Sequence, residues 1–342
     1  MLPPMVPPPP DDPALDLEVV AGAQILRDGG IVAFPTETVY GLGADATNAT
    51  AVARVFAVKG RPVGHPLIVH LASADLLDDW AVELPAAARA LAQSCWPGPL
   101  TMIVRRSGRV ADAVTGGRPT VGLRVPDHPV AHALLTAFGD GVAAPSANRF
   151  GHVSPTTAAH VRADLGPDVD LVLDGGPSEV GVESTIVDLS GERPELLRPG
   201  AIGVERLAKV LGVAPVVWGG EGEARASGML RAHYAPAARV ELVDADHVVD
   251  RAHELLGAAN GRALLVGVLA PTVLDGLPPE VMELEPVGGP EDHARALYDR
   301  LRQADRLGVH VLLAVPPTDA GTPAGIAVLD RLRRAAAAST PG

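Results

Sequence analysis

The spacing of apolar runs between residues 31 and 189 constrains the fold of this chain more than any other feature. Short apolar runs alternate with helical stretches at irregular intervals, and glycine or proline lies close to several of the runs. Such runs, bounded by turn residues, indicate buried strands. Because strands and helices do not alternate regularly, the pattern favours an α/β fold with a twisted, mixed sheet over a regular doubly wound one.

The expected strands of this half are residues 31–34, 67–70, 101–104, 121–125, 142–144, 171–173 and 185–189. The expected helices are residues 17–27, 50–58, 85–94, 129–138, 157–165 and 203–211. Helical spacing of apolar residues supports the helices, and glycines mark several of their ends. The segment PTETVYGLG, residues 35–43, is expected to be a loop that leaves the first strand.

A simpler alternation begins at Arg239. Strands are expected at 240–243, 263–269 and 309–315, and helices at 247–258, 291–307 and 324–338. This order predicts a small parallel α/β domain. The sequence therefore divides into a Pro-rich tail at 1–13 that we expect to be disordered, a first domain at 14–212, a linker at 213–238 and a second domain at 239–342.

Composition excludes several classes of protein. The length of 342 residues is more than one core usually supports, which agrees with two domains. A formal net charge of -13 argues against strong binding of nucleic acid, and the 3% of aromatic residues offer few stacking surfaces. Cys95 is the only cysteine, so no intrachain disulfide can form. With no signal peptide and no membrane span in the sequence, we expect a cytoplasmic location.

Two cations stand close together where the helix at 50–58 gives way to a loop. The chain has only two lysines, Lys59 and Lys209, and the first is followed by Arg61 in the segment KGRPVGHPL. On an extended backbone, Lys59 and Arg61 would lie on the same side and could converge on a polyphosphate. The alternative is a solvated basic turn, which is the usual role of an isolated K-x-R.

Arg124 lies inside an otherwise apolar strand, where a cation needs an anionic partner. That partner is either a carboxylate of the protein, the more frequent case, or the carboxylate of a substrate, which the guanidinium fits equally well. In PTETVYGLG, the hydroxyls of Thr36, Thr38 and Tyr40 could hold a polar ligand or could simply cap a turn. The residues alone leave both questions open.

Further polar side chains follow predicted strands. APSANRFGHVSPT, residues 144–156, groups small polar residues around two prolines, and VESTIVDL and ELLRPG place Glu183, Ser184 and Arg198 beside strands. Such loops suit nucleotide recognition, although each also has an ordinary turn interpretation. The Walker A, dinucleotide, HExxH and GxSxG motifs are absent from the sequence.

Eight segments in this order resemble the L-threonylcarbamoyladenylate synthase family: PTETVYGLG, K-x-R with PLIVH, PGPLT, LRVP, APSAN with SPT, VESTIVD, LRPG and HYAP. The likeness covers residues 16–238 directly. The last part is similar to the Rossmann-like domain of the long form of the synthase. The resemblance implies a twisted mixed-sheet, YrdC-like synthase domain followed by a smaller parallel α/β domain, with 213–238 as a lid over the cleft.

The resemblance also implies an activity. L-Threonine, bicarbonate and ATP, with Mg²⁺ as the cofactor and no organic cofactor, would give threonylcarbamoyl-AMP, pyrophosphate and water. A separate transferase would pass the threonylcarbamoyl group to adenosine 37 of tRNA, and the chain itself is not expected to bind tRNA strongly. Since the threonine amine is the nucleophile, no catalytic triad is needed, and charge neutralisation by Lys59 and Arg61 would supply the catalysis.

Family positions carried onto this sequence give two sets of site residues. The expected threonine contacts are Thr38, His70, Arg124, Ala144 and Ser184. The expected ATP contacts are Lys59, Arg61, His65, Thr120, Ser146, Asn148, Ser154, Arg198 and Tyr234, and no protein side chain is expected to ligate a metal. Two departures stand out: His65 occupies a position where the family pattern has a small polar residue, and ASGM replaces the usual SPGM before HYAP.

Three other functions remain alternatives. A carbamoyl-adenylate step in hydrogenase maturation uses a related domain, but those proteins carry zinc-binding cysteines and this chain has one cysteine. An RNA-binding module would need a basic surface, which the acidic balance disfavours. A regulator that binds nucleotide through its C-terminal domain would have no need of the site motifs.

Overall fold

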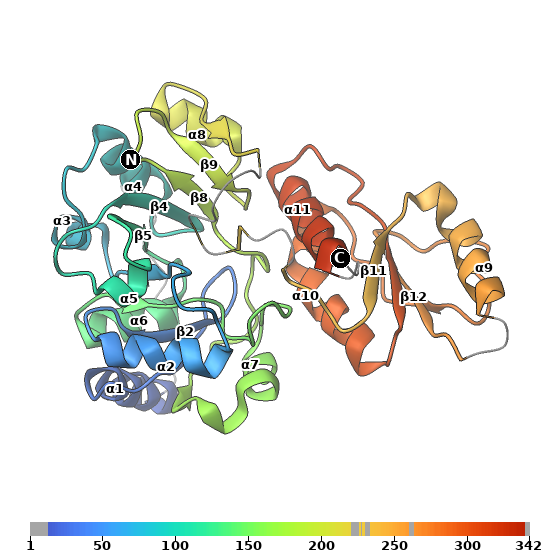
Figure 1. Cartoon of the computed structure of the whole chain (residues 1–342), viewed down its shortest axis with the longest axis horizontal. Coiled ribbons are helices and arrows are strands. Elements are labelled where there is room, and N and C mark those ends of the chain that lie inside the picture. Colours follow the sequence, from blue (N-terminus) through green and yellow to red (C-terminus); the bar gives the residue numbers. More distant parts are fainter. Residues whose placement is uncertain (1–12, 220–225, 227, 230–232, 260–262, 339–342) are drawn as a thin grey trace. The chain divides into compact units, whose positions relative to one another are not determined.

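The computed structural model describes residues 13–219, 226, 228–229, 233–259 and 263–338 (Figure 1). Nearly all of the predicted tail at 1–13 and part of the predicted lid, residues 220–225, 227 and 230–232, lie outside the described residues. The chain forms two compact units. The first comprises 1–150, 154–179 and 183–229, and the second comprises 151–153, 180–182 and 230–342. The finer domain boundaries given above stay predictions.

The first unit contains one mixed sheet, in which ten strands are described. Their order across the sheet is β10-β9-β8-β4-β5-β3-β6-β2-β1-β7, with parallel and antiparallel pairs in nearly equal use. The predicted fold class, with a mixed sheet in this half, is therefore confirmed. The strands are β1 Val32–Phe34, β2 Gly41–Asp45, β3 Ile68–His70, β4 Leu100–Arg105, β5 Thr120–Arg124, β6 Val142–Ala143, β7 Leu171–Val172, β8 Thr185–Asp188, β9 Glu195–Arg198 and β10 Val216–Val217.

Helices cover both faces of this sheet. Those described are α1 Pro13–Arg27, α2 Ala49–Lys59, α3 Leu77–Trp80, α4 Ala86–Cys95, α5 Asp112–Thr115, α6 Pro129–Phe138, α7 Ala158–Leu165 and α8 Val204–Leu211, with short 3₁₀ turns at Ala74–Leu76 and Gly166–Asp168. Helices α2, α4, α7 and α8 pack on one face, while α1 and α6 pack on the other over β1 and β6 (Figure 1). The cores are built mostly from Ala, Val and Leu, as the scarcity of aromatics requires.

Local sequence signals explain where the helices start and stop. Helix α2 begins after Asn48, whose side chain accepts hydrogen bonds from the amides of Thr50 and Ala51. It ends at Lys59, because Gly60 adopts a left-handed conformation with φ of 63° that residues with a side chain seldom take. The end of α2 thus places Lys59 at the start of the basic loop, as predicted.

The prediction that PTETVYGLG is a loop throughout is wrong at its C-terminal end. Residues from Gly41 onward form β2, which pairs with β1 through Phe34 and Gly41 and with β6 through Ala44 and Ala143. The extended backbone on the K-x-R segment is also wrong, since Lys59 is helical and Gly60 is left-handed. The two cations therefore reach their positions by a turn and not by alternation along a strand.

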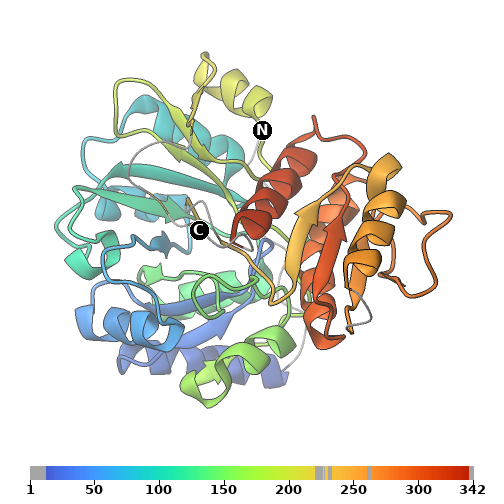
Figure 2. The ribbon, with the colours of Figure 1, turned by 45° about the vertical axis from the view of Figure 1, so that its right-hand side comes forward.

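The second unit contains a parallel sheet, in which four strands are described in the order β11-β14-β12-β13, as predicted for a small parallel α/β domain. Its elements are β11 Arg239–Leu242, a 3₁₀ turn Ala245–His247, α9 Val248–Ala258, β12 Val266–Leu269, β13 Met282–Glu283, α10 Pro290–Arg306, β14 Val311–Ala314 and α11 Pro323–Ala338. Helix α9 packs on one face of the sheet, and α10 and α11 lie on the other (Figure 2).

Candidate functional site

Strand register gathers the predicted site residues on one face of the first unit's sheet. His70 is paired with Arg124 and Ile68 with Gly122, while Gly122 is also paired with Ile103. Paired residues point to the same side of a sheet, and so do residues two apart along a strand. The side chains of His70 and Arg124 therefore lie on the face of the sheet that also carries Ile68 and Ile103. This face is opposite the one that packs against α4.

The loop between β1 and β2 is organised by the hydroxyl of Thr36. Its Oγ1 lies 2.8 Å from Thr38 Oγ1, donates to the carbonyl of Val39 at 2.7 Å, and accepts from the amides of Thr38 and Val39. Ser178 Oγ donates to the carbonyl of Thr36, which ties this loop to a distant part of the chain. Both threonines are buried, so the loop is held rigidly by its own side chains as well as by its neighbours.

Arg124 reaches that loop from the end of β5. Its Nη1 donates to Thr38 Oγ1 at 2.9 Å, and its Nη2 lies 2.6 Å from a carboxylate oxygen of Glu37. Its Nε donates to the carbonyl of Gly98 at 3.3 Å. Both Arg124 and Glu37 are buried. The anionic partner of Arg124 within the protein is thus Glu37, a residue that the sequence analysis did not single out.

His70 lies beside this ion pair at the end of β3. Its ring packs edge-on against Phe34, with 5.8 Å between ring centroids. Burial, together with the nearby charge of Arg124, lowers the pKa of His70 to about 3. The imidazole is therefore neutral at physiological pH. Its Nδ1 has no hydrogen-bond partner among the described residues, so it is available to a ligand.

The depressed pKa of His70 predicts a loss of stability at low pH. Because the folded pKa of about 3 lies below the ordinary value of 6.5, the unfolded chain binds more protons between these limits. Stability should be unaffected by this group above pH 6.5 and should fall as the pH drops towards 3. Between pH 7 and 5, wild type should lose about 2 kcal/mol more than a His70→Gln variant, measured by urea unfolding. Equal losses in the two proteins would contradict the assignment of a buried, neutral His70.

Lys59 is one of the buried cations of the predicted ATP set. Its Nζ donates to the carbonyl oxygens of Ser146 and Asn148, and its own carbonyl accepts from the amide of Phe150. Burial holds the pKa of Lys59 well below its usual range, and the charge of Arg61 lowers it further. The lysine therefore anchors the loop at 146–150. Its amine lies against this loop with little negative charge nearby to balance it.

Arg61 and His65 gather around the ring of Phe150. The guanidinium of Arg61 lies 5.6 Å from the ring centroid and donates to the carbonyl of Pro66 at 3.1 Å. The ring of His65 packs edge-on against Phe150 at 5.7 Å. Partial burial and the charges of Arg61 and Arg118 lower the pKa of His65. The histidine at this unusual position is thus part of the same cluster as the K-x-R segment.

Two more predicted residues meet at the start of β8. Arg198 donates to the carbonyl of Ser184 through Nε at 3.0 Å and to its hydroxyl through Nη2 at 3.1 Å, and that hydroxyl lies 2.8 Å from Thr101 Oγ1. Next to this group, Ser154 Oγ donates to Glu183 at 2.6 Å. The structure therefore places the predicted threonine residue Ser184 and the predicted ATP residue Arg198 in direct contact.

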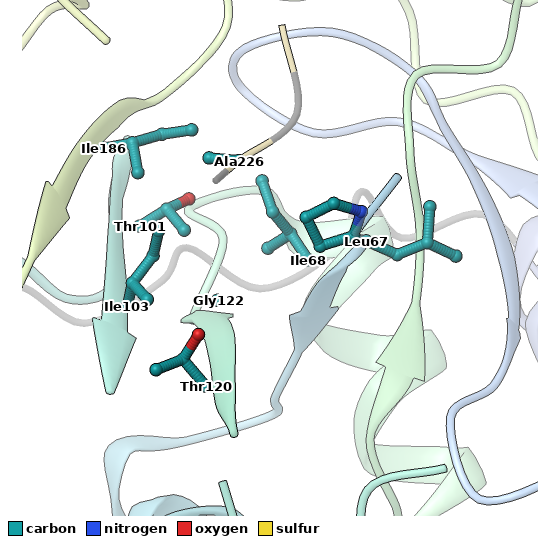
Figure 3. A pocket seen from close by; sticks show the side chains of 9 residues that line it. Leu67, Ile68, Thr101, Ile103, Thr120, Gly122, Ile186 and Ala226 are labelled. Atoms are coloured by element: carbon teal, nitrogen blue, oxygen red, sulfur yellow. The ribbon is translucent and has the colours of Figure 1, made fainter. Parts of the chain in front are cut away.

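A small pocket opens on the same face of the sheet (Figure 3). Most of its walls are apolar, and the hydroxyls of Thr101 and Thr120 supply polar atoms. Ala226, from the predicted lid segment, closes one side. Its lining residues are Pro66, Leu67, Ile68, Thr101, Ile103, Thr120, Gly122, Ile186 and Ala226. Mostly apolar walls with a few polar groups are the usual lining of small-molecule sites.

The remaining predicted residues fall into two groups. Ala144 donates its amide to the carbonyl of Ile68, and Ser146 forms a bridge to Gly41, so both lie beside the face that carries the pocket. Tyr234 belongs to the second unit and has a φ of 61°, with its ring next to those of His233 and Tyr298. Whether each of these side chains binds threonine or ATP stays a prediction.

Sequence reasoning missed Glu37, Thr101 and Phe150, and it named Glu183 without predicting its contact. Glu37 stands inside PTETVYGLG, and the buried strand residue Arg124 indicated that an anionic partner had to be near. Phe150 and Glu183 stand inside the quoted segments as well, but apolar or acidic side chains in a turn carry no signal of their own. Their role becomes visible only when the contacts of Arg61 and Ser154 are known.

Comparison with known proteins covers both units. Residues 24–200 match the Sua5/YciO/YrdC family, described as "Telomere recombination", and residues 202–337 match the Sua5 C-terminal domain, described as "Threonylcarbamoyl-AMP synthase, C-terminal domain". The chain belongs to the Sua5/YciO/YrdC family. It is 42% identical to the threonylcarbamoyl-AMP synthase of Pyrococcus abyssi, over 93% of each chain. It is 39% identical to that of Bacillus subtilis, over 94% of this chain and 93% of the relative.

Solved structures give the same relationship. The Pyrococcus abyssi Sua5 protein complexed with L-threonine has a TM-score of 0.86 and 40% identity, covering 95% of each chain. A variant of that protein with a histidine and a tyrosine replaced by alanine also has a TM-score of 0.86, with 39% identity over 95% of this chain and 94% of that chain. The family resemblance and the fold class predicted from the sequence are confirmed.

Proposed function

We propose that this chain is a threonylcarbamoyl-AMP synthase, which makes its product from L-threonine, bicarbonate and ATP and releases pyrophosphate. The observation that carries the proposal is the 42% identity to the Pyrococcus abyssi synthase over 93% of both chains, which spans both units. A relative with L-threonine bound has nearly the same fold. The transfer of the product to tRNA would be the work of a separate transferase.

The geometry of the site supports a division of labour. The hydroxyl-rich β1–β2 loop, with Thr38 and Arg124, and the neutral ring of His70 would hold threonine. The apolar pocket beside Thr120 would take the adenine ring. Ser184 and Arg198 lie in contact, so the two substrates would meet near the start of β8. Such positioning converts a reaction between separate molecules into one within a single complex.

The reaction needs no protein nucleophile. The threonine amine adds to carbon dioxide or bicarbonate, and an oxygen of the resulting carbamate attacks the α-phosphorus of ATP, from which pyrophosphate leaves. Lys59 and Arg61 would neutralise the charge that builds up on the phosphates. Since burial holds the pKa of Lys59 low, a triphosphate beside it would favour the protonated amine and make the cation available where it is needed.

Mg²⁺ would enter with ATP. No group of three or more His, Cys, Asp or Glu that could hold a metal occurs in the part of the chain that is described. Mg²⁺ commonly keeps most of its ligands from water and substrate phosphates, with few from protein. The residues present therefore fit a metal that arrives bound to the triphosphate, where it would shield the phosphate charge.

The setting of the reaction is part of the proposal. Threonylcarbamoyl-AMP is a mixed anhydride, and a lid formed by residues 213–238 would protect it from water. No helix of the described residues has the length and apolar character needed to cross a bilayer. We propose a cytoplasmic location, where ATP, threonine and tRNA are all present.

The direct test is pyrophosphate release by the purified protein with Mg²⁺-ATP. We expect release that requires both L-threonine and bicarbonate, and formation of threonylcarbamoyl-AMP detected by mass spectrometry. Omitting either co-substrate should reduce the signal to background. Pyrophosphate release that ignores threonine, or its complete absence under all conditions, would reject the assignment.

A further inference from the structure

The carboxylate of Glu37 is buried without hydrogen bonds. Its side chain is 7% exposed, and neither of its oxygens has a hydrogen-bond partner among the residues described. The 2.6 Å approach of Arg124 Nη2 makes an ion pair, but the contact lacks hydrogen-bond geometry, since Nη2 is also without such a partner. Buried ionised groups normally have well-aligned partners, because an unsatisfied charge is costly. Glu37 therefore has unused capacity as an acceptor.

Arg124 has unused donors in the same place. Two of its five N–H groups form hydrogen bonds with residues that the structure describes, one from Nε with the carbonyl of Gly98 and one from Nη1 with Thr38. The remaining N–H groups include both on Nη2, which faces Glu37. A guanidinium with free donors and a carboxylate with free acceptors thus lie side by side in a buried position.

Other acidic side chains lie near Glu37. Burial, followed by the charges of Glu37 and Glu179, raises the pKa of Asp127, and Arg124 opposes that shift. The neighbouring His128 has its pKa lowered by burial, so it adds no cation at neutral pH. Arg124 is consequently balanced by more than one acidic group, and this side of the pair would attract a second cation.

We propose that the Glu37–Arg124 ion pair is the receptor for the zwitterionic end of the amino-acid substrate, with Glu37 binding its α-ammonium and Arg124 its carboxylate. In the empty site, the two side chains neutralise each other. On binding, the substrate inserts between them, so each charge exchanges one partner for another. This inference rests on the proposed function and assigns Glu37, which the family-derived contact set did not include, as a substrate-binding residue.

Charge balance is the physical reason for this arrangement. An arginine alone would leave an uncompensated buried cation in the empty site, and a lone carboxylate would do the same with the opposite sign. A zwitterion has no net charge, so its insertion between Arg124 and Glu37 leaves the total buried charge unchanged. The misaligned contact between Nη2 and the carboxylate means that few good hydrogen bonds are lost when the pair opens.

The test compares ligands that lack one charge each. Threonine, 3-hydroxybutyrate, which has no amine, and threoninol, which has no carboxylate, are titrated calorimetrically into wild type and Glu37→Gln. Wild type should prefer threonine over 3-hydroxybutyrate by about 30-fold or more. In Glu37→Gln this ratio should fall below about threefold, and 3-hydroxybutyrate itself should bind more tightly because no carboxylate competes for Arg124.

Other outcomes separate the alternatives. If Glu37 only stabilises the fold, Glu37→Gln will weaken threonine and 3-hydroxybutyrate equally, and the unchanged ratio overturns the inference. The surface variant Glu254→Gln, which removes a carboxylate paired with Arg251, should leave the ratio as in wild type. If thermal melts show that Glu37→Gln does not fold, Glu37→Ala, which also removes the carboxylate, takes its place, and a ratio equal to that of wild type again overturns the inference.

Failure of the inference is distinct from failure of the proposed function. A wild-type protein that neither binds threonine nor releases pyrophosphate in its presence removes the synthase assignment. A wild-type protein with threonine-dependent turnover, together with an unchanged ligand ratio in Glu37→Gln, removes only the role given to Glu37.

Discussion

Replacing Lys59 with methionine should lower kcat for threonine-dependent pyrophosphate release by about 10²–10³-fold. Methionine keeps much of the length of lysine and suits a buried position, so the loop at 146–150 loses two hydrogen bonds but little packing. Loss of the charge should slow mainly the chemical step, in which the bonds at the phosphates change. The measurement is steady-state kinetics with ATP and threonine varied in turn.

The only other lysine provides the matched control. Lys209 is exposed in the last turn of α8, and Lys209→Met should turn over like wild type. Thermal melts of both variants show whether the fold is kept. A kcat for Lys59→Met within about threefold of wild type would mean that this amine holds the loop and does not act on the phosphates.

The strands of the first unit could be predicted because their sequences are short and apolar. The β2 strand was not predicted, because its sequence, GLGAD, contains two glycines, which usually mark a turn. The structure gives another reason for one of them. A Cβ on Gly43 would lie 2.6 Å from Val142 and 2.8 Å from Phe34, so glycine is required there by the close approach of neighbouring strands. Packing of this kind cannot be predicted from the residues next to the glycine in the sequence.

The site shows a similar limit. A buried arginine in a strand indicated that a carboxylate had to be near, but local sequence could not choose between a substrate and a residue that precedes Arg124 by 87 positions. The two cations of K-x-R could be predicted as site residues from their residue type. The predicted direction of their side chains was wrong, because the left-handed Gly60 turns the chain between them. Residue types were thus predictable, whereas the pairing among them depends on sheet register and loop closure.

Replacing Arg124 with methionine should have the largest effect on stability and also abolish turnover. The variant leaves Glu37 as an unpaired buried carboxylate, which should destabilise the protein by about 3–5 kcal/mol. Thr38 and Gly98 lose a donor as well. Urea unfolding and calorimetry measure the change, and Arg89→Met, which breaks an exposed pair with Asp78, should leave the stability close to that of wild type.

The double variant Glu37→Met with Arg124→Met separates the two roles of this pair. Because it removes both buried charges together, most of the stability lost in Arg124→Met should return, as is common when a buried pair becomes apolar. Threonine binding should not return, since neither end of the zwitterion finds its counter-charge. Recovered turnover in the double variant would contradict a role for the pair in binding substrate, and stability that stays as low as in Arg124→Met would contradict the cost assigned to the unpaired Glu37. Stability restored without activity is the expected result, because the ion pair that compensates charge in the empty site is also the one that the substrate opens.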